Sequence, residues 1–220
     1  MSKSDSSHDD ITLADGASLF DACESIAARL DLSRVTLNYA KLKERLDSIR
    51  REAKWPPATL TAILLSVDPQ SEGQSRFQSM LRHAGFDPDI VHFRDAFVSL
   101  PPGRSPSEMT MKSTVSLAAR LSYIAGLMAG HPLAHFMVVS HSYELHAPLL
   151  DLAGRLPKGK VGLAYFGSLL DYRWRSSGIF DKNLGFRFFD LDEHSDELLG
   201  VNLVMRKDDS ASVPSVLGRI

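Results

Sequence analysis

The chain contains a single cysteine, Cys23, among its 220 residues. An intramolecular disulfide needs two cysteines, so none can form, and a zinc site built on cysteine is disfavoured. Long apolar runs are also missing, because no stretch reaches the roughly 18 to 20 residues that a membrane-spanning helix requires. These absences predict a protein of the reducing cytoplasm that has no membrane partner.

An excess of charge of one sign is absent as well. The chain has 25 Lys and Arg residues against 27 Asp and Glu residues, which gives a formal net charge of −2. Overall charge therefore does not favour nucleic acid, and RNA binding would need a local basic patch. Residues 1–10 are polar and acidic without the apolar centre of a signal peptide, so we expect a flexible tail there.

Apolar segments of two kinds alternate along the rest of the chain. Hydrophobic residues make up 44% of the sequence, enough for one substantial core. Strand-like runs alternate with helical periodicities, which favours an α/β fold with a largely parallel central sheet. We expect strands 1 to 5 near residues 11–14, 61–67, 89–93, 135–140 and 160–165. Right-handed crossovers predict the strand order 3-2-1-4-5.

Two polar turns follow apolar strands in this pattern. They read Asp15-Gly16-Ala17-Ser18-Leu19-Phe20 and Ser140-His141-Ser142-Tyr143-Glu144. In an open parallel sheet, ligands bind where the strands end. The predicted order places strands 1 and 4 side by side, so we expect both turns at one edge of the sheet.

The two turns resemble the signature loops of the NYN family of PIN-like nucleases, which read D-G-x-N-L-aromatic and S-G-D-S-D-F. The first turn keeps the family residues at four positions, Asp15, Gly16, Leu19 and Phe20, and has Ser18 in place of Asn. The second keeps Ser140 and departs at the next four positions, which hold His141, Ser142, Tyr143 and Glu144. The resemblance implies a PIN-like three-layer domain over residues 11–174. Residues 175–220 would be an extension that packs on or trails from it.

The resemblance also implies a metal site, and in this sequence that site is degenerate. NYN nucleases gather carboxylates to hold Mg²⁺, and Asp15 and Glu144 are the matching catalytic and metal-binding candidates. Serine hydroxyls are poor replacements for the missing acids. The segment 111–121, which matches another acidic family pattern, contains no Asp or Glu. Mg²⁺ binding is therefore expected to be weak or absent. The implied substrate-binding residues are Ser18, Lys112, Ser140, Ser142 and Arg173.

The expected function is that of a catalytically impaired NYN-type protein that binds single-stranded RNA or a protein partner. One alternative is a weak or altered Mg²⁺-dependent ribonuclease that adds Asp171 or Asp68 to the two acids. Another is a protein-interaction module that retains only the fold and binds through residues 94–102 or the tail.

Structural interpretations compete with these roles. Asp15 and Ser142 could cap helices, and Glu144 could interact with a helix dipole. Ser142 lacks the small flanking residues of a nucleophile elbow, and the four histidines between 131 and 146 lack the spacing of a zinc site. The basic residues of the helix near 39–53 are spaced for salt bridges on a solvated face, and the alternative is a surface that contacts RNA. Arg173, Trp174 and Arg175 could contact RNA, or Trp174 could be buried.

Overall fold

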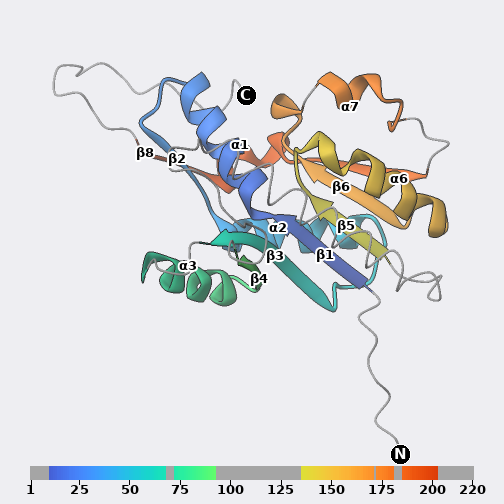
Figure 1. Ribbon diagram of the computed structural model, residues 1–220, viewed down its shortest axis with the longest axis horizontal. Helices are drawn as coiled ribbons and strands as arrows, with labels where there is room; N and C mark the ends of the chain where they lie inside the picture. Colours follow the sequence, from blue (N-terminus) through green and yellow to red (C-terminus); the bar gives the residue numbers. More distant parts are fainter. Residues whose placement is uncertain (1–9, 68–71, 93–134, 171, 181–184, 203–220) are drawn as a thin grey trace, which may run out of the picture.

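The computed structural model describes residues 10–67, 72–92, 135–170, 172–180 and 185–202. Six strands form one sheet in the order β4-β3-β1-β5-β6-β7, and every neighbouring pair is parallel. Their bounds are β1 Asp10–Asp15, β3 Leu60–Val67, β4 Asp87–His92, β5 His135–Val139, β6 Val161–Tyr165 and β7 Phe186–Asp190. The predicted α/β class is therefore confirmed (Figure 1).

The five expected strands are present, but the sheet has one strand more than predicted. The unpredicted β7 pairs with β6 and extends the sheet beyond residue 174, the predicted end of the domain. Two more unpredicted strands, β2 Arg34–Leu37 and β8 Leu199–Asn202, form a separate antiparallel pair. The region after residue 174 thus contributes to both sheets.

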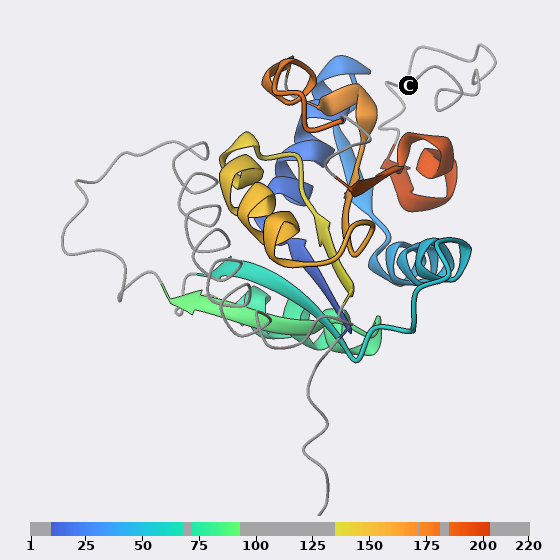
Figure 2. The ribbon, with the colours of Figure 1, turned by 90° about the vertical axis from the view of Figure 1, so that its right-hand side faces the viewer.

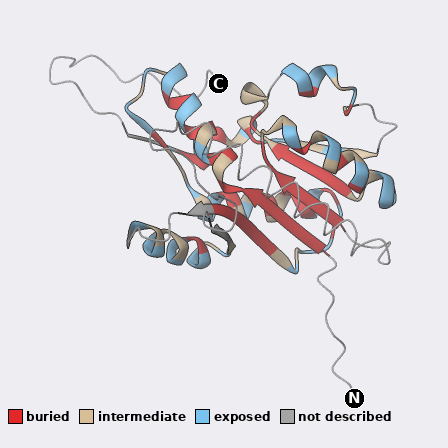
Figure 3. Cartoon of the chain, viewed as in Figure 1, coloured by how far each residue is buried: buried red, intermediate tan, exposed pale blue. Residues whose placement is uncertain are grey.

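Helices cover both faces of the sheet (Figures 1 and 2). On one face lie α1 Gly16–Arg29, α2 Tyr39–Glu52 and α3 Glu72–His83, whose apolar residues share a core with Ala14 and Val139. On the other face, α6 His146–Arg155 and the short α7 Tyr172–Ser176 pack against Leu13 and Val138. Because helices cover both faces, every residue of the central strands β1 and β5 is buried (Figure 3).

The remaining described helices are short. They are the 3-10 turns η1 Tyr143–Leu145, η2 Gly167–Leu169 and η4 Asp192–His194, and the helix α8 Ser195–Leu198. Within the ranges that the structure describes, no helix has both the length and the hydropathy needed to cross a bilayer. Lys112, Asp68, Asp171 and the segments 94–102 and 111–121 lie outside the described residues.

A buried ionic network joins the amino-terminal ends of three strands. The Arg50 side chain is 1% exposed, and its Nη2 lies 3.0 Å from Oδ1 of Asp10. The same oxygen lies 2.8 Å from Nδ1 of His135, and Nζ of Lys160 lies 2.9 Å from Nε2 of that ring. Burial lowers the pKa of His135, and the Asp10 carboxylate opposes that effect. A neutral ring with its proton on Nδ1 satisfies both contacts. This network connects α2, β1 and β5 to the start of β6.

Gly16 allows α1 to approach β3 closely. A Cβ atom at Gly16 would lie 2.6 Å from the carbonyl oxygen of Leu64 and 2.7 Å from Cδ2 of Leu65. Gly16→Ala should therefore lower the free energy of unfolding by about 2 kcal/mol, the usual effect of overpacking a core. Gly154→Ala in α6 is the matched control, because a Cβ there meets nothing within 4 Å.

The control should be neutral or raise stability by about 0.5 to 1 kcal/mol, since alanine favours a helix more than glycine does. Urea denaturation of both variants measures the difference. Equal stability of the Gly16→Ala variant and the wild type would contradict the close-approach explanation.

Candidate ligand-binding cleft

The two polar turns meet at the carboxyl edge of the sheet. From β1 the chain proceeds to β3 and β4 on one side, and then returns to β5, β6 and β7 on the other side. The strand order therefore reverses between β1 and β5, and ligands bind at such a switch point in open α/β sheets. Asp15 ends β1 and Glu144 follows β5 closely, so both lie at this edge as predicted.

Asp15 is the N-cap of α1 and is fully buried. Its Oδ1 accepts a hydrogen bond from the Ser18 amide at 3.1 Å, and its Oδ2 accepts one from the Ser140 hydroxyl at 3.0 Å. Burial raises the pKa of Asp15 to about 6, although both hydrogen bonds oppose the shift. Each oxygen already has a donor, so the capping role explains the position of this carboxyl without a metal.

His141 connects three elements at the back of the site. The amide of Phe166 donates to Nε2 of His141 at 2.9 Å, so that nitrogen carries no proton. Nδ1 therefore carries the proton and donates to Oγ of Ser18 at 3.0 Å, while the His141 amide donates to the same oxygen at 2.8 Å. Burial lowers the pKa of His141 to about 4, so the ring is neutral at pH 7. Both ring nitrogens are occupied, which leaves none for a zinc ion.

Ser142 and Glu144 form a local pair in front of His141. The Ser142 hydroxyl donates to Oε2 of Glu144 at 2.5 Å, and the Ser142 amide donates to Oγ of Ser140 at 3.1 Å. Ser142 precedes η1 but makes no side-chain cap hydrogen bond, so the predicted capping contact is not formed. The nearest histidine in sequence, His141, binds Ser18 instead, and this arrangement provides no activated serine nucleophile.

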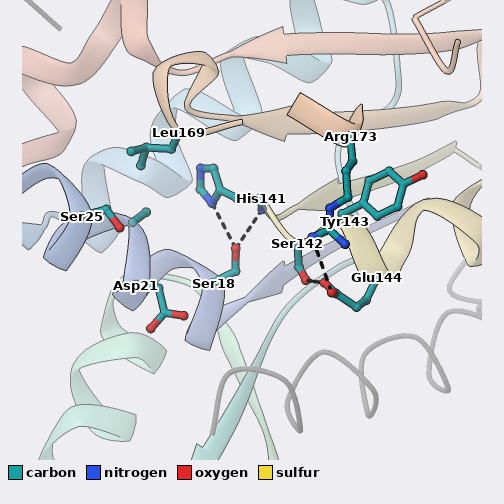
Figure 4. Close-up of a pocket in the computed structure, with 10 residues that line it drawn as sticks. Ser18, Asp21, Ser25, His141, Ser142, Tyr143, Glu144, Leu169 and Arg173 are labelled. Atoms are coloured by element: carbon teal, nitrogen blue, oxygen red, sulfur yellow. Dashed lines mark hydrogen bonds and ion pairs between the residues drawn. The ribbon is translucent and has the colours of Figure 1, made fainter. Parts of the chain in front are cut away.

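A cleft of about 250 Å³ opens in front of these residues (Figure 4). The α1 side contributes small and acidic side chains, and the opposite wall comes from the turn after β5 and from α7. The guanidinium of Arg173 lies 4.6 Å from the centre of the Tyr143 ring. The same guanidinium lies 3.9 Å from Oε1 of Glu144, too long for a hydrogen bond. The lining residues are Ser18, Asp21, Ala22, Ser25, His141, Ser142, Tyr143, Glu144, Leu169 and Arg173.

The residues present do not fit a Mg²⁺ site of the nuclease type. In the part of the chain that the structure describes, no group of three or more His, Cys, Asp or Glu residues is arranged to hold a metal ion. Asp15 is fully buried and its two oxygens already accept hydrogen bonds. Oε2 of Glu144 accepts a hydrogen bond from Ser142. Of the predicted substrate-binding residues, the cleft includes Ser18, Ser142 and Arg173, while Ser140 is buried beneath it.

Trp174 and the basic face of α2 were two other candidate RNA contacts. Trp174 is fully buried, and its indole N–H donates to the carbonyl of His141 at 3.1 Å, so it cannot stack on a base. Three cations of α2 form ion pairs on the helix, Lys41–Glu44, Lys43–Asp47 and Arg45–Glu52, and the pair Lys43–Asp47 has the predicted spacing. Among the described residues that line the cleft, the cation is Arg173, and Arg175 of the same helix is also exposed.

Sequence reasoning did not identify Asp21, Ser25 and Tyr143 as lining residues. The helical spacing of Ser18, Asp21, Ala22 and Ser25 on one face of α1 is the signal that could have found part of this wall. Tyr143 carried no such signal. No protein-family model matches the chain, and no curated protein matches it.

Proposed function

We propose that this protein is a non-cleaving NYN-type PIN-like domain that binds single-stranded RNA in the switch-point cleft. The observation that carries the proposal is the stacking of the Arg173 guanidinium on Tyr143 beside that cleft. Proteins that bind single strands combine cations for the phosphates with aromatic rings for the bases. The resemblance of the two turns to NYN loops supports the same class of ligand.

The helix α7 presents an aromatic ring and two cations to solvent. Tyr172 is 76% exposed, and its ring is open to stacking on a base. Arg173 and Arg175 are also exposed, whereas Trp174 between them holds the helix in the core. Since the ion pair between Arg173 and Glu144 is long and exposed, a phosphate can replace the carboxylate.

The cleft does not support phosphodiester hydrolysis by the metal route. Mg²⁺ needs several oxygen ligands and must keep open positions for water and phosphate. Asp15 would have to leave two hydrogen bonds and the protein interior before it could bind an ion. Asp21 and Glu144 also repel phosphates, so we expect weak binding that is favoured by low salt.

Binding without cleavage is the testable consequence. Labelled single-stranded RNA, followed by fluorescence anisotropy, should bind with an affinity that falls as salt rises, at a log–log slope of about −1.4 for two phosphate contacts. The Arg173→Ala/Arg175→Ala variant should lose most of the affinity and the slope. Incubation of the same RNA with Mg²⁺ or Mn²⁺ should leave it intact on a denaturing gel.

Arg155→Ala is the matched control, because Arg155 is an exposed arginine at the opposite end of α6 from the cleft and pairs with Asp151. It should bind RNA as the wild type does. Absence of binding even at low salt would reject the RNA proposal and favour a protein partner. Cleavage that disappears in an Asp15→Ala variant would favour the ribonuclease alternative.

A further inference from the structure

A second cleft is lined partly by η2 and α7, the two elements that also contribute to the first cleft. Its volume is about 280 Å³, and its lining residues are Tyr165, Gly167, Leu170, Arg175, Phe180 and Asp190. The two clefts are neighbours along the chain: Leu169 and Arg173 line the first, while Gly167 and Arg175 line the second. A single strand bound at Arg173 is therefore close to Arg175, two residues further along α7, and to the cleft that Arg175 lines.

The walls of the second cleft are suited to a planar group. The rings of Tyr165 and Phe180 lie 6.2 Å apart between centres, at 70° to one another. Phe188 packs against Phe180, with 4.3 Å between the ring centres. Burial and the nearby Asp190 raise the pKa of Tyr165, which keeps its hydroxyl protonated at neutral pH. A flat base can lie against these rings.

Asp190 supplies a positioned acceptor at the same cleft. Its Oδ1 accepts from the amide of Gly167 at 3.0 Å and from the amide of Asp192 at 2.9 Å. These bonds fix the carboxylate, while Oδ2 accepts no hydrogen bond from the described residues. A Cβ at position 167 would overlap Oδ2, so glycine is required for this close approach.

Arg175 places a cation beside this acceptor. Its Nη2 donates to the carbonyl of Gly167 at 3.3 Å, which holds the guanidinium at the edge of the cleft. The remaining N–H groups of a guanidinium can donate to a phosphate. Aromatic walls, a fixed acceptor and a cation are the three components that recognise one nucleotide.

We infer that this second cleft binds a guanine base of the RNA strand whose binding is proposed above, an inference that depends on that proposed function. A carboxylate only accepts hydrogen bonds. Guanine presents two adjacent donors, N1–H and the 2-amino group, on its Watson–Crick edge. Uracil, adenine and cytosine each place an acceptor beside their donor. Guanine is therefore the base that suits Asp190, with both donors directed to Oδ2, because Oδ1 already accepts from two amides.

Short oligouridines that carry one central guanine, adenine, inosine or uracil provide the test. Anisotropy titrations at low salt should show about tenfold tighter binding of the guanine strand than of the uracil strand, the effect of one hydrogen bond to a charged group. Inosine, which lacks the 2-amino group, should fall between guanine and uracil. Asp190→Asn should remove the preference for guanine while oligouridine binding is retained.

The Asn variant is chosen because its Oδ1 can still accept from the amides of Gly167 and Asp192, so the turn should persist. Its thermal unfolding should therefore match that of the wild type. The inosine comparison needs no variant and remains valid if Asp190→Asn fails to fold. Equal binding of all four strands by the wild type, or a guanine preference that survives in a folded Asp190→Asn protein, would overturn the guanine assignment alone. Failure of every strand to bind would overturn the proposed function as well.

Discussion

Replacing Arg50 with methionine is expected to lower the free energy of unfolding by about 3 to 5 kcal/mol, the usual result of removing one member of a buried ion pair. The Arg50 side chain is 1% exposed, and its guanidinium also donates to the carbonyl of Pro56 at 2.8 Å. Methionine fills similar space, so the loss reflects the Asp10 carboxylate, which keeps His135 as a donor but loses its cation, and the Pro56 carbonyl, which loses its donor.

Arg51→Met is the matched control for this variant, because the neighbouring arginine on the same helix is exposed. It should change stability by less than about 0.5 kcal/mol, as exposed substitutions usually do. Adding Asp10→Asn to Arg50→Met should recover about 1 kcal/mol or more, since the stranded charge is removed. Urea denaturation of the wild type, the two single variants and the double variant measures these differences in the free energy of unfolding. If Arg50→Met and Arg51→Met were equally stable, the buried network would contribute nothing.

The free energy of unfolding of the Asp15→Asn variant is expected to rise relative to that of the wild type as pH rises from 4 to 7. Burial raises the pKa of Asp15 from 3.8 to about 6, so the folded state binds more protons than the unfolded state between these values. The wild type therefore loses stability from this group as pH rises through the window. The change from 3.8 to about 6 corresponds to about 3 kcal/mol over the whole titration, of which about 2 kcal/mol falls between pH 4.5 and pH 7, and an uncharged Asn does not lose this stability.

His141 titrates in the same window with the opposite sign. Its pKa is lowered to about 4, so the stability that it contributes is lost as pH falls. The Asn variant retains His141, so this term cancels when the two proteins are compared. Denaturation of both at pH 4.5 and pH 7 gives the required difference.

Asp15→Ala serves as the control for the cap itself. It should show the same pH dependence as Asp15→Asn but lie about 1 kcal/mol lower at both pH values, because alanine cannot accept from the Ser18 amide. A stability difference between Asp15→Asn and the wild type that does not change with pH would show that Asp15 ionises in the folded protein as it does in the unfolded chain.

The spacing of apolar residues determined most of the sheet. Leu60–Val67 and His135–Val139 were recognisable as buried strands, because a parallel strand covered on both faces needs apolar side chains in both directions. The alternation with helices then determined that β1 and β5 lie side by side, since crossover connections are right-handed. That adjacency brought Asp15 and the turn of Ser142 and Glu144 to one edge.

Short strands depended on tertiary contacts. β2 and β8 contain four residues each and pair across more than half of the chain, so local preference is too weak to reveal them. The segment Phe186–Asp190 has an aromatic pattern that also suits a loop packed on the core, and only its pairing with β6 makes it a strand. The acidic residues after it were visible in the sequence, but the contact of Asp190 with Gly167 was not.

The chemical state of the site was decided by the tertiary structure alone. Asp15 and Ser140 are 125 residues apart, and neither the burial of that carboxyl nor its raised pKa can be read from the D-G motif. The proton position on His141 depends on the Phe166 amide, which β6 brings to it. Local sequence determines helix and strand because backbone preferences are local. Burial, pKa and tautomer arise from contacts between distant segments, and only the fold defines those contacts.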